Sequence, residues 1–226
     1  MSKQTFYILV FTLAFLACNE KTEVISVNSN INKLSKNNIK LHKLRKLFIV
    51  GDFDGNGEKD TILQHNYSGL TKSEIKYSAD PFQNKLDTVV KWFNYQEANV
   101  YLTINTNNQD TLNLGIAQGL YCLINIGDNN SDGKDELAFV IDYLDYSNLN
   151  TCKIYTLCKG KWTLLKQFNI LESAFDYTSE EIPNFSYIKD FLEKKDSKWF
   201  YRDYNDKLKD AVETKEMQLL KLEKCK

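Results

Sequence analysis

The chain reads Leu47-Phe48-Ile49-Val50-Gly51-Asp52-Phe53-Asp54-Gly55-Asn56-Gly57-Glu58-Lys59-Asp60-Thr61-Ile62-Leu63-Gln64, and this stretch decides its fold. Apolar and β-branched residues stand on both sides of a nine-residue segment that is rich in Asp, Asn and Gly. Such apolar runs predict strands, and the polar segment predicts the loop that joins them. The same order returns in Leu123-Ile124-Asn125-Ile126-Gly127-Asp128-Asn129-Asn130-Ser131-Asp132-Gly133-Lys134-Asp135-Glu136-Leu137-Ala138-Phe139-Val140-Ile141. The sequence therefore predicts two units of strand, loop and strand.

Both loops, residues 52–60 (loop 1) and 128–136 (loop 2), carry oxygen side chains at positions 1, 3, 5 and 9. Ca²⁺ takes about six to eight oxygen ligands with tolerant geometry. The predicted ligands of loop 1 are Asp52, Asp54, Asn56 and Asp60, with the backbone carbonyl of Glu58. Those of loop 2 are Asp128, Asn130, Asp132 and Glu136, with the backbone carbonyl of Lys134. Glycine stands at position 6 of each loop, where a chain wrapping around an ion turns sharply. Two Ca²⁺ sites are predicted; the alternative is a pair of Asx-rich turns that cap only their own backbone.

The flanking strands and the missing twelfth ligand exclude an EF-hand. An EF-hand has a bidentate Glu at position 12 between two helices, whereas position 12 is Leu63 in loop 1 and Phe139 in loop 2. The segments 51–60 and 127–136 resemble the calcium loops of FG-GAP and VCBS repeats, which are found in integrin-type β-propellers and in many bacterial surface proteins. The resemblance implies that the aligned Asp and Asn residues bind Ca²⁺ and tie adjacent strands of a sheet.

The number of loops limits the fold that this resemblance implies. A closed propeller usually has about four to eight blades, whereas this chain carries two such loops. We therefore expect a mainly β fold, a small antiparallel β domain with two units of strand, calcium loop and strand, and not a full propeller.

The N-terminus predicts export. Residues 1–17 contain one early lysine and an apolar run of about twelve residues, which is the pattern of a signal peptide and too short for a membrane span. The run ends at Cys18 in Phe15-Leu16-Ala17-Cys18, which resembles the lipobox of bacterial lipoproteins. That resemblance implies lipidation of Cys18 and a membrane anchor; the alternative is an ordinary secretory signal with an incidental cysteine. By analogy, Asn19 after the lipid cysteine favours the outer membrane.

Composition divides the rest of the chain. Residues 18–45 are rich in Asn, Ser and Lys and predict a flexible tether. Residues 46–204 predict one β domain, and 205–226 predict a C-terminal helix lying on the sheet or a solvated tail. Without residues 1–17 the basic and acidic residues nearly balance, so the charge pattern does not indicate a nucleic-acid partner.

Further strand and helix signals fill in the domain. The predicted strands are 46–50, 60–65, 99–104, 120–126, 136–142, 151–157 and 162–168. Two hairpins are predicted, one turning at Lys159-Gly160 and one at Asp196-Ser197. A weaker helical signal covers 81–92.

Four cysteines follow Cys18, namely Cys122, Cys152, Cys158 and Cys225. Export permits disulfides. Cys152 and Cys158 lie six residues apart in one predicted strand, too far apart to bridge each other. Either could meet Cys122 on a neighbouring strand, and unpaired buried thiols are the alternative.

The sequence shows no catalytic constellation: the two histidines form no evident pair with a nucleophile, and phosphate-loop and zinc motifs are absent. Tyr143, Asp145 and Tyr146 follow a predicted strand and mix aromatic and polar groups, which favours a contact loop. We therefore expect a lipid-anchored, calcium-binding envelope protein that acts without catalysis, on a protein or glycan or as a structural component. The alternative is an envelope polymer hydrolase with a carboxylate site that one sequence does not reveal.

Overall fold

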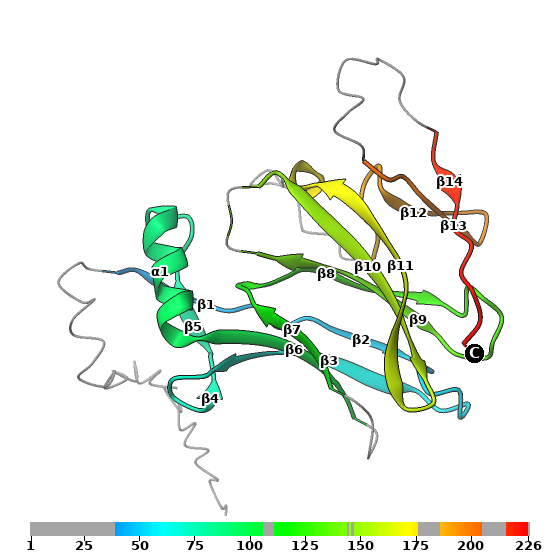
Figure 1. The fold of residues 1–226 in the computed structure, drawn as a ribbon, viewed down its shortest axis with the longest axis horizontal. Coiled ribbons are helices and arrows are strands. Elements are labelled where there is room, and N and C mark those ends of the chain that lie inside the picture. Colours follow the sequence, from blue (N-terminus) through cyan, green and yellow to red (C-terminus); the bar gives the residue numbers. More distant parts are fainter. Residues whose placement is uncertain are drawn as a thin grey trace, which may run out of the picture. The chain divides into compact units, whose positions relative to one another are not determined.

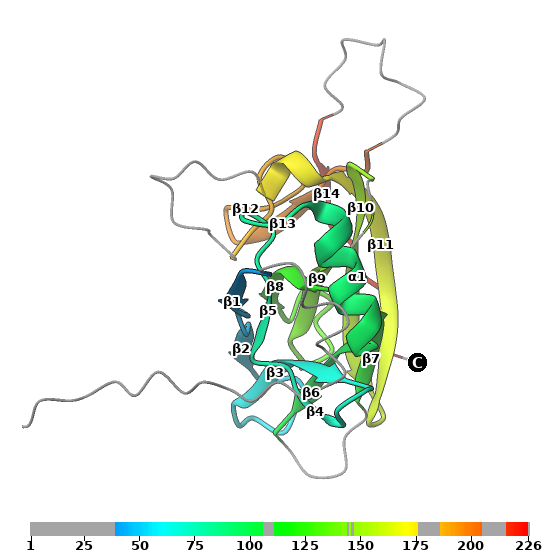
Figure 2. The same ribbon diagram turned by 90° about the vertical axis from the view of Figure 1, so that its left-hand side faces the viewer.

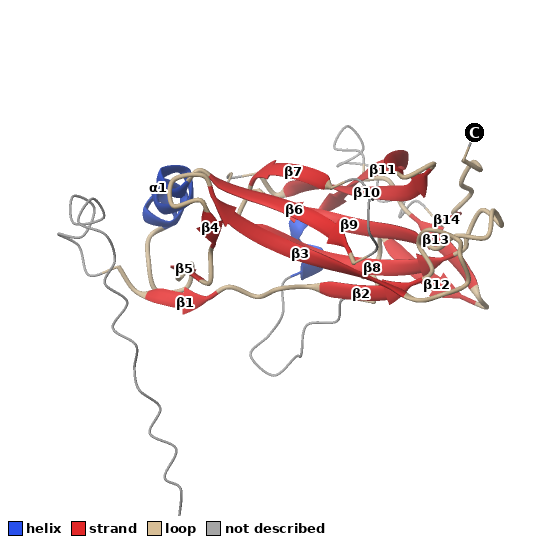
Figure 3. Ribbon diagram, turned by 90° about the horizontal axis from the view of Figure 1, so that it is seen from below, coloured by secondary structure: helices blue, strands red, loops and turns tan. Residues whose placement is uncertain are grey.

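The computed structural model describes residues 39–105, 111–143, 145, 147–175, 186–204 and 216–225. The predicted signal peptide and Cys18 lie outside these residues. Strands dominate the described part, which confirms the mainly β prediction (Figure 3). No helix in these ranges is long and apolar enough to cross a membrane.

The strands are β1 (Leu41–Lys43), β2 (Phe48–Gly51), β3 (Asp60–Ser68), β4 (Ser73–Glu74), β5 (Tyr77–Ala79), β6 (Ala98–Ile104), β7 (Leu112–Ile116), β8 (Gly119–Gly127), β9 (Glu136–Asp142), β10 (Leu149–Cys158), β11 (Lys161–Leu171), β12 (Leu192–Lys195), β13 (Lys198–Tyr201) and β14 (Gln218–Leu219). The helical elements are α1 (Leu86–Gln96) and the 3-10 helix η2 (Glu172–Phe175).

The strands form four antiparallel sheets (Figure 1). One sheet has the order β2-β3-β6-β7, with β4 paired to β3, and a second has the order β11-β10-β9-β8. Smaller sheets are formed by β12-β13-β14 and by β1-β5. Each of the seven predicted strands is confirmed, and both predicted units of strand, loop and strand are antiparallel pairs, β2 with β3 and β8 with β9.

In the sheet of β8 to β11, strands β8 and β9 are buried on both faces. Along β9 the side chains alternate between two cores: Leu137 and Phe139 pack toward β3 and β6, whereas Ala138 and Val140 face the opposite way. The hairpin of β12 and β13 covers this second face, with Leu192 and Trp199 in contact with the core there. Six of the seven residues of β9 are buried, which is why this strand reads as a continuous apolar run.

Both predicted hairpins are confirmed. β10 and β11 are joined by Lys159 and Gly160, with φ of +50° and +77°. β12 and β13 are joined by Asp196 and Ser197, with φ of +47° and +66°. Two successive positive φ angles match the right-handed twist of the paired strands, so these short turns fix the register of each hairpin.

The end of the predicted tether belongs to the folded part. β1 pairs with β5 near α1 (Figure 2). Ile39 and Leu44 pack against a small core that contains Val89 and Phe93 of α1. The boundary predicted at residue 45 is therefore wrong, because a few apolar side chains among lysines suffice to pair and bury this segment. The helix predicted over 81–92 is confirmed with later bounds, as α1.

The C-terminal helix is corrected where the structure describes the chain. Residues 216–225 contain β14 and otherwise no regular secondary structure, and Leu219 pairs with Phe200 of β13. Leu220 is buried in the core and Leu222 packs against it. Inward residues two apart are the strand period and not the helical one. Residues 205–215 of the predicted helix lie outside the described residues.

The cysteine pairing also differs from the prediction. Cys158 forms a disulfide with Cys225, and Cys122 and Cys152 are free and buried. Val140 of β9 is the register partner of both Cys122 and Cys152, so a whole strand separates these two thiols. The bridge from Cys122 is therefore wrong, and the alternative of buried unpaired thiols holds for these two residues. Burial raises the pKa of Cys122 to about 12.

Candidate metal centre

The two loops hold their position-1 carboxylates in the same way. In loop 1, Asp52 Oδ1 accepts the Asn56 N–H at 3.1 Å and Asp52 Oδ2 accepts the Gly57 N–H at 2.9 Å. In loop 2, Asp128 Oδ1 accepts the N–H of Asp132, and Asp128 Oδ2 accepts that of Gly133, both at 3.0 Å. Each loop is therefore wrapped around its first carboxylate.

Positions 3 and 5 repeat the correspondence. The N–H at position 5 donates to the side chain at position 3, from Asn56 to Asp54 Oδ1 at 3.1 Å and from Asp132 to Asn130 Oδ1 at 2.9 Å. An amide also donates to a carboxylate across these positions, at 3.1 Å in both loops. The amide stands at position 5 in loop 1 and at position 3 in loop 2, so each loop has one amide and one carboxylate at these two positions.

The backbone N–H at position 7 donates to the side chain at position 5 in each loop. The Glu58 N–H donates to Asn56 Oδ1 at 2.6 Å, and the Lys134 N–H donates to Asp132 Oδ1 at 3.2 Å. The ammonium of Lys134 donates instead to the Leu157 carbonyl at 2.9 Å. The lysine charge is thus held by β10, which fits a residue that would offer only its backbone carbonyl to an ion.

Two positions in each loop have left-handed backbone. Position 6 is glycine in both, with φ of +85° at Gly57 and +88° at Gly133. Position 4 is Gly55 at +79° in loop 1 and Ser131 at +60° in loop 2. Glycine adopts these angles without the steric cost that a β-carbon brings, so the sequence pattern matches the backbone path that the loops require.

The position-9 carboxylates are the buried ends of the two clusters. Asp60 and Glu136 are 1% and 0% exposed. Asp60 Oδ2 accepts the Phe53 N–H at 3.1 Å, and Glu136 Oε2 accepts the Asn129 N–H at 2.8 Å. Glu136 Oε1 is buried without a hydrogen-bond partner in the described structure. A buried carboxylate oxygen with no partner is costly, and a cation bound in the loop would offset this cost.

Three carboxylates gather in each loop. Their closest oxygens lie within 4.8 Å of one another in Asp52, Asp54 and Asp60, and likewise in Asp128, Asp132 and Glu136. Burial first, and then the neighbouring carboxylates, raise the pKa of Asp60. The same causes raise the pKa of Glu136 to about 8, with Asp132 and Asp128 as the neighbours. The hard-oxygen donors and their repulsion fit a divalent cation such as Ca²⁺.

The two loops also touch each other. The Asp135 N–H donates to the Asp52 carbonyl at 2.8 Å, and Asp135 Oδ2 accepts the Asp52 N–H at 3.2 Å. The same oxygen accepts Asn125 Nδ2 at 2.8 Å, and Asn125 Nδ2 also donates to the Val50 carbonyl. A β-carbon at Gly51 would lie 2.3 Å from that amide nitrogen. The repeated loop pattern does not predict this contact, because position 8 is Lys59 in loop 1 and Asp135 in loop 2.

The predicted contact loop is only partly described. Tyr143 and Asp145 are exposed, and Asp145 accepts the Ser147 N–H at 3.1 Å. Tyr146 lies outside the described residues. The exposure of Tyr143 and Asp145 leaves both side chains accessible, and the prediction of a binding role for them stays a prediction.

A second carboxylate cluster was not predicted. The Tyr121 hydroxyl donates to Glu172 Oε1 at 2.5 Å and lies beside the carboxyl group of Asp142. The ring of Tyr121 stacks on Phe175, with centroids 4.8 Å apart. Burial, and then the Glu172 charge, raise the pKa of Asp142 to about 7 against the hydrogen bond from Tyr121. Tyr121 and Glu172 are 51 residues apart, and nothing in the sequence links them.

Comparison of the chain with protein-family models, with curated proteins and with solved structures finds no match.

Proposed function

We propose that this chain is a lipid-anchored, calcium-binding protein of the bacterial cell envelope, in which Ca²⁺ at loops 1 and 2 stabilises the fold. The single observation that carries the calcium proposal is the unpartnered oxygen of Glu136, fully buried beside Asp128 and Asp132. The position-by-position match of the hydrogen bonds in the two loops supports the same role for loop 1. Both observations fit the resemblance of these loops to FG-GAP and VCBS repeats.

The ion would be held by the side chains at positions 1, 3, 5 and 9 and by the backbone carbonyl at position 7. Bound Ca²⁺ offsets the repulsion among the three carboxylates of each loop. At a free concentration of about 100 times the dissociation constant, one site stabilises the fold by about 2.7 kcal/mol. This is a large share of the stability of about 5–15 kcal/mol that is usual for a domain.

Thermal melting with and without a chelator tests the calcium proposal. We expect EGTA to lower the melting temperature of the full chain, and we expect Asp52→Ala and Asp128→Ala each to remove part of that difference. Lys59→Ala is the matched control, because Lys59 is an exposed loop residue outside the ligand set. Equal melting temperatures with Ca²⁺ and with EGTA would overturn the proposal.

The anchor is proposed from Cys18 and its preceding apolar run. Several acyl chains on one cysteine bury enough methylene groups, at about 0.8 kcal/mol each, for stable membrane binding. Cys18→Ser should move the protein from the membrane fraction to the soluble fraction and abolish labelling with a palmitate analogue. Cys122→Ser is the control, since Cys122 is a buried thiol. Retention of membrane binding and of label by Cys18→Ser would contradict the anchor.

The partner is proposed to be a protein or a glycan at the envelope, contacted without catalysis. Tyr143 and Asp145 are accessible for this role. Cross-linking in cells through a photoreactive residue at Tyr143 tests it, with the exposed Phe82, in the turn after β5, as the comparison position. The same products from both positions would count against a contact at Tyr143.

A second candidate is a hydrolase of envelope polymers, and one observation favours it. The Tyr121 hydroxyl donates to Glu172 and lies beside Asp142, so two carboxyl groups share one phenol, and a pair of carboxyl groups is what most glycosidases use. A pKa of about 7 suits Asp142 to a role as a general acid. Release of soluble sugar from purified cell-wall polymer, lost on Asp142→Asn and on Glu172→Gln, would support this candidate over a non-catalytic role.

A further inference from the structure

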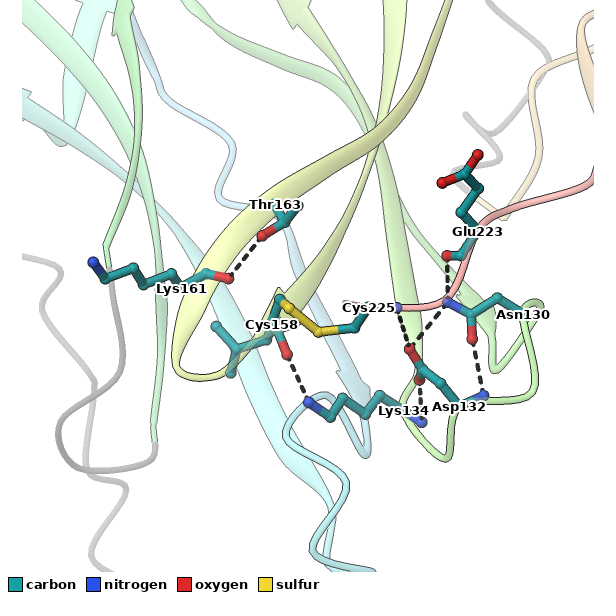
Figure 4. Close-up of a disulfide and its surroundings, with 9 residues drawn as sticks. Asn130, Asp132, Lys134, Cys158, Lys161, Thr163, Glu223 and Cys225 are labelled. Atoms are coloured by element: carbon teal, nitrogen blue, oxygen red, sulfur yellow. Dashed lines mark hydrogen bonds between the residues drawn. A yellow bond between two sulfur atoms is a disulfide. The ribbon is translucent and has the colours of Figure 1, made fainter.

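The C-terminal residues 221–225, here called the strap, lie against loop 2 (Figures 1 and 4). The Glu223 carbonyl accepts a hydrogen bond from Asn130 Nδ2 at 3.1 Å. The Lys224 ammonium donates to the Ser131 carbonyl at 2.7 Å, and the Cys225 N–H donates to Asp132 at 3.4 Å. The strap thus contacts three successive residues of loop 2, of which positions 3 and 5 are predicted Ca²⁺ ligands.

The strap orients the side chain of Asn130. A backbone carbonyl only accepts hydrogen bonds, so the NH₂ group of Asn130 must face Glu223. Its Oδ1 then turns into the loop, where it accepts the Asp132 N–H at 2.9 Å. The Cys225 N–H holds Oδ2 of Asp132, while Oδ1 accepts the Lys134 N–H. The strap therefore fixes which oxygens two ligands present to an ion.

Loop 1 has no such support within the described residues. The hydrogen bonds of its corresponding side chains, Asp54 and Asn56, join residues of loop 1 alone. Asn56 is exposed, whereas Asn130 is 8% exposed beneath the strap. The two loops share one internal design and differ in this external contact.

The disulfide is what keeps the strap in place. Cys225 ends the strap and is bonded to Cys158, the last residue of β10. Beside it, the Lys134 ammonium of loop 2 reaches the Leu157 carbonyl. A segment without a covalent link loses much conformational freedom on docking, and the disulfide reduces that loss because it keeps Cys225 beside β10. Figure 4 shows the disulfide, the strap and loop 2 together.

We propose that the strap is a positioning element of the second calcium site and that the Cys158–Cys225 disulfide makes the Ca²⁺ affinity of that site depend on oxidation. This inference rests on the proposed calcium function. With a dithiol reductant, one thiolate attacks a sulfur of the disulfide, and the second thiol then displaces the mixed disulfide. Two electrons and two protons pass to Cys158 and Cys225, and the reductant leaves as a cyclic disulfide. Because coupling is reciprocal, Ca²⁺ at loop 2 protects the disulfide from reduction by the same factor.

Calorimetric titration of the full chain with Ca²⁺ tests this, using Asp52→Ala to report loop 2 and Asp128→Ala to report loop 1. With the disulfide intact and then with dithiothreitol, we expect the affinity of loop 2 to fall about tenfold, a change that loss of the contacts to two ligands readily produces. We expect the affinity of loop 1 to change less than about twofold, since the strap contacts positions 3 to 5 of loop 2, whereas loop 1 is held by Asp135 at position 8. Unchanged binding at loop 1 also shows that the reduced protein is folded.

Two further variants keep the inference open to contradiction. Cys158→Ser with Cys225→Ser should bind at loop 2 as weakly as the reduced protein and should not respond to dithiothreitol. Lys224→Ala keeps the disulfide and should weaken loop 2 about threefold, whereas the exposed Lys221→Ala should not. If the serine variant does not fold, the comparison of Lys224→Ala with Lys221→Ala decides alone, and equal affinities overturn the inference.

The outcomes separate the inference from the proposed function. Equal affinity of loop 2 before and after reduction, with normal binding at loop 1, overturns the inference alone. Failure of both Asp52→Ala and Asp128→Ala to bind Ca²⁺, when the unaltered chain also does not bind it, overturns the calcium function and the inference with it.

Discussion

Asp135 of loop 2 holds the backbone of Asp52 in loop 1 through two hydrogen bonds, one from its N–H to the Asp52 carbonyl at 2.8 Å and one to its Oδ2 from the Asp52 N–H at 3.2 Å. Asp52 is the residue around which loop 1 wraps. The contact therefore joins the position of a loop 1 ligand to the conformation of loop 2, although Asp135 belongs to neither predicted ligand set.

The first prediction is that Asp135→Ala weakens Ca²⁺ binding at loop 1. The substitution removes the acceptor for the Asp52 N–H and for Asn125 Nδ2. Loss of such hydrogen bonds costs about 1–2 kcal/mol, and we expect a loss of about five- to thirtyfold in affinity. Titration in the Asp128→Ala background measures loop 1 alone. Lys59→Ala changes the corresponding position of loop 1 and should have no effect; equal affinities for the two variants would contradict the coupling.

The second prediction concerns Gly51, which ends β2 beside the same contact. A β-carbon there would lie 2.3 Å from Asn125 Nδ2 and 2.4 Å from Asp135 Oδ2. Gly51→Ala must displace one of these groups, and we expect a loss of about 1–3 kcal/mol in the free energy of unfolding. Urea unfolding measures it. Asn125→Ala in the same chain removes the closest atom, so the double variant should lose less than the sum of the single losses; strict additivity would place the strain elsewhere.

The third prediction separates two left-handed positions of loop 2. Gly133 has φ of +88° with open space around its α-carbon, and Ser131 has φ of +60°. Gly133→Ala should cost about 1–2 kcal/mol because of the backbone angle alone. Ser131→Gly relieves that strain but gives the unfolded chain more freedom, so its net effect should stay within about 0.5 kcal/mol. Urea unfolding of the two variants should thus differ by about 1 kcal/mol or more, and equal stabilities would mean that the loop backbone relaxes.

The loops are predictable from the sequence because the residues that define them lie close together in the chain. The ligand side chains, the glycine at position 6 and the strands on both sides all lie within about twenty residues. The same holds for the two hairpins, where the short turns fix the register. Whether the loops hold calcium stays a prediction.

What the sequence did not reveal depends on contacts between distant segments. Cys158 and Cys225 are 67 residues apart, and the sequence alone equally allows a bridge to Cys122, which β9 prevents for Cys152 because it lies between β8 and β10. The spacing of the C-terminal apolar residues fits one face of a helix. In the structure β14 pairs with the edge of β13, and Leu220 and Leu222, two residues apart, both pack against the core. Ile39 and Leu44 lie in a segment whose polar composition predicts a tether, and they are partly buried because they pack against the core that contains α1 residues.

The last prediction is that neutralising Asp142 stabilises the protein near neutral pH. Its pKa is raised from 3.8 to about 7 in the folded state, mainly by burial and then by the Glu172 charge. The folded protein therefore holds this proton more tightly than the unfolded chain does. Its contribution to stability is fully present below about pH 4 and is lost as the pH rises toward about 7.

A shift of about three pKa units corresponds to at most about 4 kcal/mol in the free energy of unfolding. Partial access of solvent to Asp142 reduces the expected contribution to about 1–2 kcal/mol. Asp142→Asn keeps a polar group of the same size beside Tyr121 and removes the charge. Above pH 7 it should therefore be more stable than the unaltered chain by about this amount, while at pH 4 the two should be equal. Urea unfolding between pH 4 and 8 with saturating Ca²⁺ measures the difference.

Asp145→Asn is the control, because Asp145 is exposed. If Asp142→Asn and Asp145→Asn show the same dependence on pH, the Asp142 carboxylate is not the buried charge that opposes folding at neutral pH.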